Sequence, residues 1–283
     1  MRTDMKPAPF TYLRARTRAE VDEALTEFPD AALLAGGQSL LPQLNERRIR
    51  PAALVDVNAL QDEPEHPSWD GDGLRIGPIV RQAALERSPE VARHAPLLAT
   101  ALRKVAYPAV RSRGTLVGAL AHAHPRSELP ATFVLLGGTV QVRSSGGTRK
   151  VEAGELFTGP CRTSLRPGEW IEGVNIPGAS PTAGFGLAEF SRRGADFALC
   201  GAVARADQGR ISLVWFGRGA TPRPHSLPGT SHQPLAARIA QHVREMPHFD
   251  GGDAAYHHHL ASSLAMRAVR QALKEASPSD DPR

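Results

Sequence analysis

Two glycine-bearing turns are the segments of this sequence best suited to chemistry. The first is Ala35-Gly36-Gly37-Gln38-Ser39 and the second is Gly114-Thr115-Leu116-Val117-Gly118-Ala119. Glycine permits a left-handed backbone and lets backbone N–H groups approach an anion closely, and the hydroxyls of Ser39 and Thr115 add donors. Two such turns could clamp one pyrophosphate group. For either turn alone, a tight connection without a ligand is the simpler interpretation.

Histidines and cysteines offer a second kind of chemistry. His122 and His124 form an HxH pair, and residues 257–259 are a histidine triplet. No acidic residues complete a ligand set, so we expect no metal site, and we interpret the triplet as the surface of a helix. We expect Cys161 and Cys200 to be buried, unreactive thiols. The sequence contains no GxGxxG, Walker A, GxSxG, HExxH or CxxC signature.

The elements that must position the first turn begin with a short amphipathic helix. Thr17 and Glu20 have the spacing of a capping box, and apolar residues follow at helical spacing as far as Phe28. Residues 31–35 and 53–57 have the composition of strands, and residues 38–46 have helical character. The first sixty residues therefore form one unit in which the Gly-Gly turn joins a strand end to a helix start.

The middle of the chain mixes strands with helices. Gly146-Gly147 is a hairpin signal after an alternating segment, and Pro89 interrupts a helical pattern. The second glycine-bearing turn lies in a glycine-punctuated stretch between helices. The expected strands are residues 74–80, 139–144 and 170–176, and the expected helices are residues 82–93, 97–105 and 128–136.

The best linker in the chain is the segment Pro177-Gly178-Ala179-Ser180-Pro181, where we place a domain boundary. The predicted domains are residues 1–177, with lobes of about 1–60 and 61–177, and residues 182–276. Residues 277–283 have no apolar anchor and are an expected disordered tail. The second domain is predicted to hold antiparallel strands at residues 184–192, 197–205 and 211–216 and helices at residues 235–246 and 254–276.

Composition limits the class of protein. The chain has 283 residues, of which 41% are hydrophobic and 22% charged, with a net charge of +5. Basic residues are scattered or lie beside acids, so we do not expect nucleic-acid binding. No apolar stretch approaches the roughly 20 residues of a membrane span. The first residues have no apolar core, and with only two cysteines we expect a cytoplasmic, reducing location.

A wider resemblance links the two turns. The run Leu33-Leu34-Ala35-Gly36-Gly37-Gln38-Ser39-Leu40-Leu41-Pro42 and the run from Pro108 through Gly114-Thr115-Leu116-Val117-Gly118-Ala119 to His124-Pro125 and Glu128-Leu129-Pro130 occur in order. Phe157-Thr158-Gly159-Pro160 and Arg192-Arg193-Gly194-Ala195-Asp196-Phe197-Ala198-Leu199 follow. Together they resemble the medium, FAD-binding subunits of molybdenum hydroxylases, the family of xanthine dehydrogenase and aerobic carbon monoxide dehydrogenase. The resemblance extends from about Pro9 to Ala276.

The resemblance implies an α+β fold: a two-lobed FAD-binding domain of the vanillyl-alcohol-oxidase (PCMH) type and a smaller C-terminal domain of antiparallel sheet and helices. FAD would lie between the lobes. No catalytic side chain is implied. The resemblance implies that two segments bind FAD, together with an acid, Glu128, for flavin hydroxyls and two apolar contacts, Val105 and Ile171. The residues of the two segments are Leu33, Leu34, Ala35, Gly36, Gly37, Gln38, Ser39 and Leu40, and Thr115, Leu116, Val117, Gly118 and Ala119.

The implied activity is electron transfer within a complex. An iron–sulfur small subunit would supply electrons, a molybdopterin large subunit would act on the substrate, and this chain would pass electrons from FAD to an external acceptor. Two cysteines cannot supply the four ligands of an iron–sulfur cluster. The sequence leaves the substrate open, and it leaves oxygen, NAD and a quinone open as acceptors.

Three positions depart from the family pattern and leave two alternatives. Val117 stands at the first glycine of a Thr-x-Gly-Gly pattern, His124 replaces a common Asp, and Tyr107 replaces a common His. A β-branched residue would be costly at Val117 if that position required a positive φ. A flavin-free docking subunit is therefore one alternative, and a stand-alone flavin oxidase is another.

Overall fold

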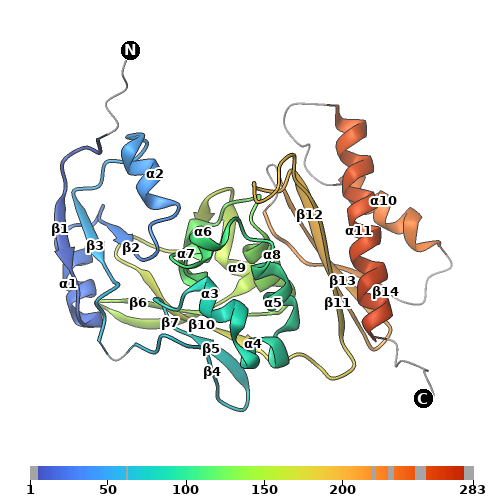
Figure 1. Ribbon diagram of the computed structural model, residues 1–283, viewed down its shortest axis with the longest axis horizontal. Helices are drawn as coiled ribbons and strands as arrows, with labels where there is room; N and C mark the ends of the chain where they lie inside the picture. The colour runs from blue at the N-terminus through green and yellow to red at the C-terminus, as the bar shows by residue number, and fades with distance from the viewer. Residues whose placement is uncertain (1–5, 62, 218–220, 229–232, 246–252, 277–283) are drawn as a thin grey trace.

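The protein is described by a computed structural model that covers residues 6–61, 63–217, 221–228, 233–245 and 253–276. Figure 1 shows an elongated molecule with the N-terminal strands at one end, a sheet with helices in the middle and a second antiparallel sheet at the other end. Helices and mostly antiparallel sheets make it an α+β protein, as the sequence predicts. Among the described residues, no helix combines the length and apolar character needed to cross a membrane.

The N-terminal unit is a small parallel sheet with two helices. Its strands are β1 (Thr11–Arg14), β3 (Ala53–Asp56) and β2 (Ala32–Leu34), in that spatial order. Helix α1 (Arg18–Glu27) begins at Thr17, whose hydroxyl accepts a hydrogen bond from the N–H of Glu20 at 3.2 Å. Helix α2 (Leu40–Asn45) follows the first glycine turn directly. The predicted Thr17 cap is thus confirmed, but the Glu20 carboxylate accepts from the N–H of Arg16 at 2.7 Å rather than from the N–H of Thr17 as in a capping box.

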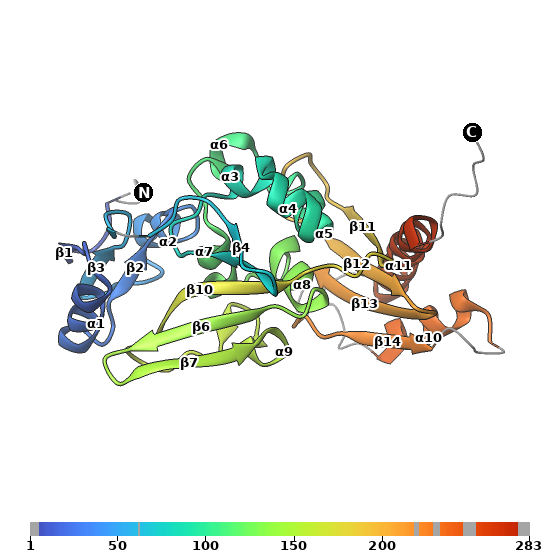
Figure 2. The ribbon, with the colours of Figure 1, turned by 90° about the horizontal axis from the view of Figure 1, so that it is seen from below.

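The central unit is a five-stranded sheet covered on one side by short helices (Figure 2). The strands, in spatial order, are β4 (Ser68–Trp69), β5 (Gly73–Ile76), β10 (Trp170–Pro177), β6 (Thr139–Ser144) and β7 (Gly147–Glu152). A small separate ladder joins β8 (Phe157–Gly159) and β9 (Arg162–Thr163). The helices are α3 (Gln82–Arg87), α4 (Pro89–His94), α5 (Pro96–Leu102), α6 (Pro108–Arg111), α7 (Leu116–His122), α8 (Glu128–Leu135) and α9 (Ala153–Leu156).

The C-terminal unit is a four-stranded antiparallel sheet crossed by a long helix. Strands β11 (Gly184–Phe190), β12 (Cys200–Asp207), β13 (Arg210–Gly217) and β14 (His225–Pro228) pair in chain order. Helix α11 (Ala254–Ala276) packs on this sheet beside α10 (Leu235–Glu245). A Cβ at Gly186 would overlap the carbonyl oxygen of Ala268, so the glycine allows the helix to approach the strand closely.

One core joins the central and C-terminal units. Phe185, Leu187, Val203, Val214 and Phe216 from the C-terminal sheet belong to the same buried cluster as the apolar residues of α5 and α8. Packing therefore continues across the proline-rich segment at residues 177–181. The limits of the two predicted domains stay a prediction. Residues 277–283 lie outside the described residues, as does Met246 at the end of one predicted helix.

Some segments differ from the sequence patterns. Strand β5 ends at Ile76 rather than continuing to Val80, because Pro78 has no N–H for a sheet ladder. The segments expected to be strands around Arg192 and Phe197 are instead a loop between β11 and β12. The patterns also do not predict β1, α7 or β14.

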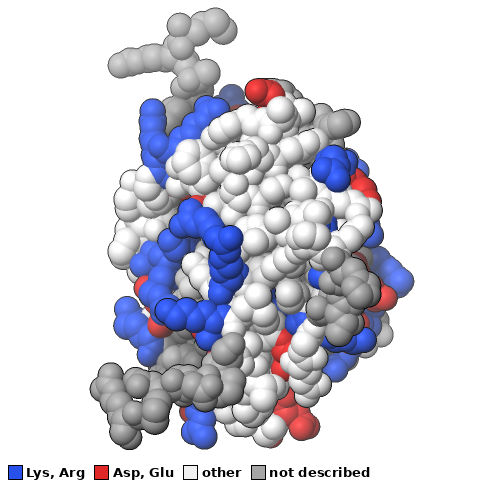
Figure 3. Space-filling model, turned by 90° about the vertical axis from the view of Figure 1, so that its right-hand side faces the viewer, with Lys and Arg blue, Asp and Glu red and all other residues white. Residues whose placement is uncertain are grey.

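Basic side chains are spread over the C-terminal end of the molecule. The view in Figure 3 shows Lys and Arg in separate groups around a broad uncharged area. On α11, Arg267, Arg270 and Lys274 are exposed. Among the described residues, this face therefore carries no single continuous basic stripe.

Candidate functional site: a cavity between the two glycine turns

A cavity of about 540 Å³ opens where the N-terminal unit meets the helices of the central unit. The two glycine turns, far apart in the sequence, both line it. The structure also brings Val105, Glu128 and Ile171 to the same wall. The predicted residues that line the cavity are Leu33, Ala35, Gly36, Gly37, Gln38, Ser39, Leu40, Val105, Thr115, Val117, Gly118, Ala119, Glu128 and Ile171. Leu34 and Leu116 do not line it.

The first turn leaves strand β2 and enters helix α2. Gly37 has a φ of +72°, which is the left-handed conformation that glycine adopts without strain. Its carbonyl oxygen accepts a hydrogen bond from the N–H of Leu41 at 3.0 Å. Ser39 precedes the helix and makes no side-chain capping bond. The Ser39 hydroxyl is therefore available at the cavity wall.

The two turns touch each other. A Cβ on Gly36 would lie 2.7 Å from the Cα of Gly114 and would overlap the carbonyl oxygen of Arg113. Only glycine allows this approach, because the colliding atoms are backbone and cannot move aside cheaply. The close contact holds both turns against one space, as the pyrophosphate hypothesis requires.

The second turn becomes the first turn of helix α7. The Thr115 hydroxyl accepts a hydrogen bond from the N–H of Gly118 at 2.9 Å and so caps the helix. Val117 lies inside α7 and is not among the residues with a positive φ. Its β-branched side chain therefore causes none of the backbone strain that a positive φ would bring.

An acidic pair stands beside the cavity. Glu128, in the first turn of α8, is only 4% exposed, and burial raises the pKa of its carboxyl to about 8, with the nearby Glu189 carboxyl of β11 adding to the rise. Burial also raises the pKa of Glu189. With a pKa of about 8, the Glu128 carboxyl keeps its proton at neutral pH.

The loop between β11 and β12 closes part of the cavity. Ala195, Asp196 and Phe197 line it. The ring of Phe197 stacks on the ring of His124, with centroids 4.1 Å apart. Arg126 donates hydrogen bonds to the carbonyl oxygens of Ala198 at 2.8 Å and Phe197 at 2.6 Å. The loop is thus tied to the segment between α7 and α8.

The histidines and cysteines singled out in the sequence lie in different environments. Burial lowers the pKa of His124 to about 4, helped by His122 and Arg126. Among the described residues, no group of three or more His, Cys, Asp or Glu side chains could hold a metal ion. Cys200 is buried as expected, but Cys161 is exposed because it lies in a turn with a φ of 53°. His257 is buried rather than on the surface, since it faces the sheet side of α11.

Several lining residues carry no signal in the sequence. Gln82, Leu165, Trp170 and Phe197 reach the cavity from four separate segments. Gln82 donates from its side-chain amide to the carbonyl oxygen of Thr115 at 3.2 Å, which ties α3 to the second turn. Only the tertiary fold brings these residues together, although Phe197 falls inside one of the family-like segments.

Known proteins are similar to this chain over nearly its full length. The profile of a family described as "FAD binding domain in molybdopterin dehydrogenase" matches residues 8–179. The chain is 34% identical to the nicotine 6-hydroxylase medium subunit of Paenarthrobacter nicotinovorans over 277 residues, covering 92% of this chain and 97% of that one. It is 36% identical to caffeine dehydrogenase subunit beta of a Pseudomonas species over 233 residues, with 79% and 78% covered.

Solved structures agree with the sequence relatives. Carbon monoxide dehydrogenase from Hydrogenophaga pseudoflava superposes with a TM-score of 0.86 at 27% identity, covering 96% of this chain and 100% of that one. Quinoline 2-oxidoreductase from Pseudomonas putida 86 gives a TM-score of 0.84 at 32% identity, covering 96% and 99%. This chain therefore belongs to the family of FAD-binding medium subunits of molybdenum hydroxylases, which are oxidoreductase subunits that work as part of a complex.

Proposed function

We propose that this chain holds FAD in the cavity between its two glycine turns and passes electrons from an iron–sulfur small subunit to an external acceptor. A molybdopterin large subunit would complete the enzyme and carry the substrate site. One observation carries the proposal. The turn at Gly36 and the turn at Gly114 are far apart in the sequence but meet at a single cavity, which Val105, Glu128 and Ile171 also line.

The cavity fits the diphosphate of FAD through dipoles. The Gly36–Gly37 turn presents backbone N–H groups, and the Ser39 hydroxyl is free of a capping role. Among the described residues, no Lys or Arg lines the cavity. The diphosphate would therefore be held by N–H groups and hydroxyls rather than by an ion pair. Leu34 and Leu116 would support the two turns from behind.

The remaining walls fit the ribityl chain and the ring system. Val105, Leu165 and Ile171 give an apolar surface suited to a flat aromatic ring. Glu128 also lines the cavity, and its carboxyl would bind flavin hydroxyls. Gln38, Ala35 and Ala119 also line the cavity.

Bound FAD would supply the redox chemistry, since flavin accepts two electrons and can release them singly or together. The side chains of this protein would bind and orient it. Phe197 and its loop would limit water at the mouth, because Arg126 and His124 hold that loop in place. No side-chain acid or base is assigned a catalytic role.

The finer architecture belongs to the same proposal. Residues 1–177 would be a two-lobed FAD-binding domain of the vanillyl-alcohol-oxidase type, with lobes at about 1–60 and 61–177. Residues 182–276 would be the C-terminal domain of the carbon monoxide dehydrogenase flavoprotein kind, and residues 277–283 a disordered tail. A cytoplasmic location is part of the proposal, on the grounds of composition alone.

The alternative of a flavin-free docking subunit depends on Val117, His124 and Tyr107, and the backbone strain considered at Val117 is its main physical argument. Val117 is helical, so it does not distort the second turn. A stand-alone oxidase is opposed by family membership, since the relatives are subunits of complexes.

The test is an absorbance titration of the purified full-length chain with FAD, followed by release of the flavin on heating and its separation from FMN. We expect about one FAD per chain. The Gly36→Ala variant is the matched comparison and should bind more weakly. A chain that is folded by circular dichroism but retains no FAD at excess cofactor would overturn the proposal.

A further inference from the structure

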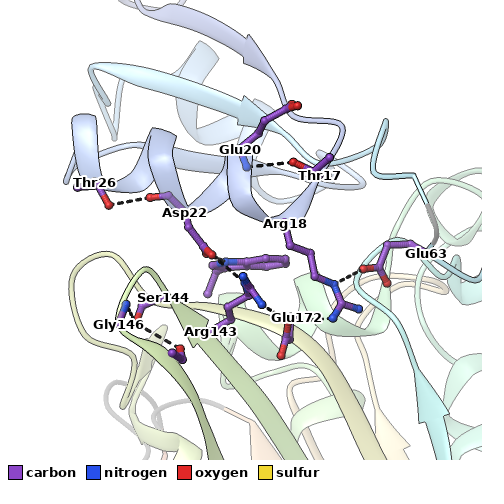
Figure 4. A network of polar contacts seen from close by, with 12 residues as sticks. Thr17, Arg18, Glu20, Asp22, Thr26, Glu63, Arg143, Ser144, Gly146 and Glu172 are labelled. Carbon is purple, nitrogen blue, oxygen red and sulfur yellow. Dashed lines mark hydrogen bonds and ion pairs between the residues drawn. The ribbon is translucent and has the colours of Figure 1, made fainter.

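A polar network joins helix α1 to the central sheet (Figure 4). The Asp22 carboxylate, on α1, accepts a hydrogen bond from the Nε of Arg143 on β6 at 2.8 Å and one from the indole Nε1 of Trp170 on β10 at 2.9 Å. One turn earlier on the same helix face, Arg18 donates to Glu63 at 2.6 Å and lies 3.2 Å from Glu172 on β10. Three other segments thus meet at this helix.

The network is largely buried, so its contacts are specific. The side chains of Asp22, Glu63 and Glu172 are 9%, 3% and 7% exposed. Arg18 and Arg143 are the basic groups that face them, at 45% and 29% exposure. A buried carboxylate is strongly destabilising once its partner is removed. The position of α1 over the sheet is therefore fixed by charge as well as by packing.

The same segment of β10 forms part of the cavity wall. Trp170 pairs with Arg143, and Ile171 with Val142, but the register then shifts, so that Glu172 is an extra residue in the ladder. Trp170 belongs to the N-terminal core and Ile171 to the central core. Both residues line the cavity. The bulged segment 170–172 is held from α1 on either side of Ile171.

We propose that Asp22 is a positioning residue for the flavin cavity: through Arg143 and Trp170 it fixes the bulged segment of β10 and the distance between the N-terminal unit and the central sheet. Asp22 acts indirectly, because neither Asp22 nor Arg143 lines the cavity. The inference rests on the proposed FAD function for its ligand, and on the apoprotein for its geometry.

The decisive comparison is Asp22→Ala with Asp22→Asn. Alanine leaves the indole N–H and the Arg143 guanidinium without their acceptor. Asparagine keeps an oxygen that accepts from Trp170 Nε1 but loses the ion pair with Arg143. The carboxylates of Glu63 and Glu172 then face Arg18 and Arg143. We expect the alanine variant to weaken FAD binding about tenfold and to change the visible circular dichroism of bound FAD. The asparagine variant should recover most of both.

The matched control is Thr17→Ala, which removes the cap of the same helix without touching the network. It should lower stability, while FAD affinity and the flavin spectrum stay as in the wild type. If Asp22→Ala behaves like this control, with lowered stability and an unchanged spectrum and affinity, Asp22 is merely structural and the proposal is overturned.

Two further measurements keep the test independent of folding and of FAD. If Asp22→Ala does not fold, Arg143→Lys takes its place, because it keeps the positive charge and loses the Nε contact to Asp22. A flavin affinity and spectrum equal to those of the wild type in this variant would overturn the proposal. In the flavin-free chain, the amides of Ile171 and Gly173 should exchange faster in the Asp22 variant than in the Thr17 variant. Equal exchange overturns the positioning role, whereas failure of the wild type to bind FAD overturns only the proposed function.

Discussion

The partly buried carboxyl of Glu189 on β11 lies close enough to the buried carboxyl of Glu128 on α8 to raise its pKa, across the contact between the central and C-terminal units. Burial is the largest reason that the pKa of Glu128 rises to about 8, and the exposed Lys104 opposes the rise. At neutral pH the pair therefore holds a proton beside the cavity.

This pair predicts that stability falls as pH rises. Below its ordinary pKa of 4.5, Glu128 is protonated in both the folded and the unfolded chain. Between that value and about 8, the unfolded chain releases the proton while the folded chain keeps it, which favours unfolding. Glu128→Gln should remove this pH dependence and so reduce the change in the free energy of unfolding between pH 5 and 8 by on the order of 3 kcal/mol. Urea unfolding of the flavin-free chain at pH 5, 6.5 and 8 measures it, with the exposed Glu152→Gln as control. Parallel profiles for the wild type and Glu128→Gln would contradict a proton retained on buried Glu128 in the folded chain.

Gly36→Ala should separate the two glycine turns. The added Cβ would overlap the Arg113 carbonyl oxygen and approach the Cα of Gly114, and neither backbone atom can rotate away. We expect a loss of about 2 kcal/mol or more in the free energy of unfolding, together with weaker FAD binding. Gly154→Ala is the matched control, because no atom lies within 4 Å of its added Cβ. Denaturant unfolding and FAD titration of both variants check this, and equal behaviour would show that the turns are not in close contact.

Val117→Gly should weaken the protein rather than restore a flavin site. Val117 is 6% exposed and helical, so glycine there removes a buried side chain and adds backbone freedom. The helix term alone costs about 1 kcal/mol relative to alanine. We therefore expect Val117→Gly to be less stable than Val117→Ala by about that amount, with no gain in FAD affinity in either variant. Thermal unfolding and FAD titration measure both effects. A higher affinity in the glycine variant would mean that the side chain obstructs the cofactor.

Local signals predict much of the fold. Thr17 starts α1, Gly146-Gly147 turns the β6–β7 hairpin, and the turn at 207–209 joins β12 to β13, because each depends on residues close in sequence. Helix α7 has no such signal. Its Gly118 and Val117 are poor helix formers, and the helix is stabilised by the Thr115 cap and by burial against the central core.

Local pattern does not predict strand β1, nor does it predict which separate segments reach the cavity. Strand β1 is mostly exposed and is defined by its parallel pairing with β3, forty residues later. The two glycine turns could be recognised from their chemistry, but their direct contact at Gly36 and Gly114 could not. The same holds for Cys161, whose exposure follows from a turn conformation that only the fold imposes.

Arg126→Ala should loosen the loop between β11 and β12 without unfolding the chain. Arg126 donates hydrogen bonds to the carbonyl oxygens of Phe197 and Ala198. The substitution removes both bonds but keeps the stacking of the His124 and Phe197 rings. Each lost bond from a charged donor is worth about 1.5–3 kcal/mol. We expect faster amide exchange at residues 194–199 and faster limited proteolysis there, with β12 and β13 protected as before. Arg103→Ala, which loses only a 3.2 Å bond to Thr100 on the surface, is the control. If the loop exchanges equally in both variants, Arg126 does not hold it over the cavity.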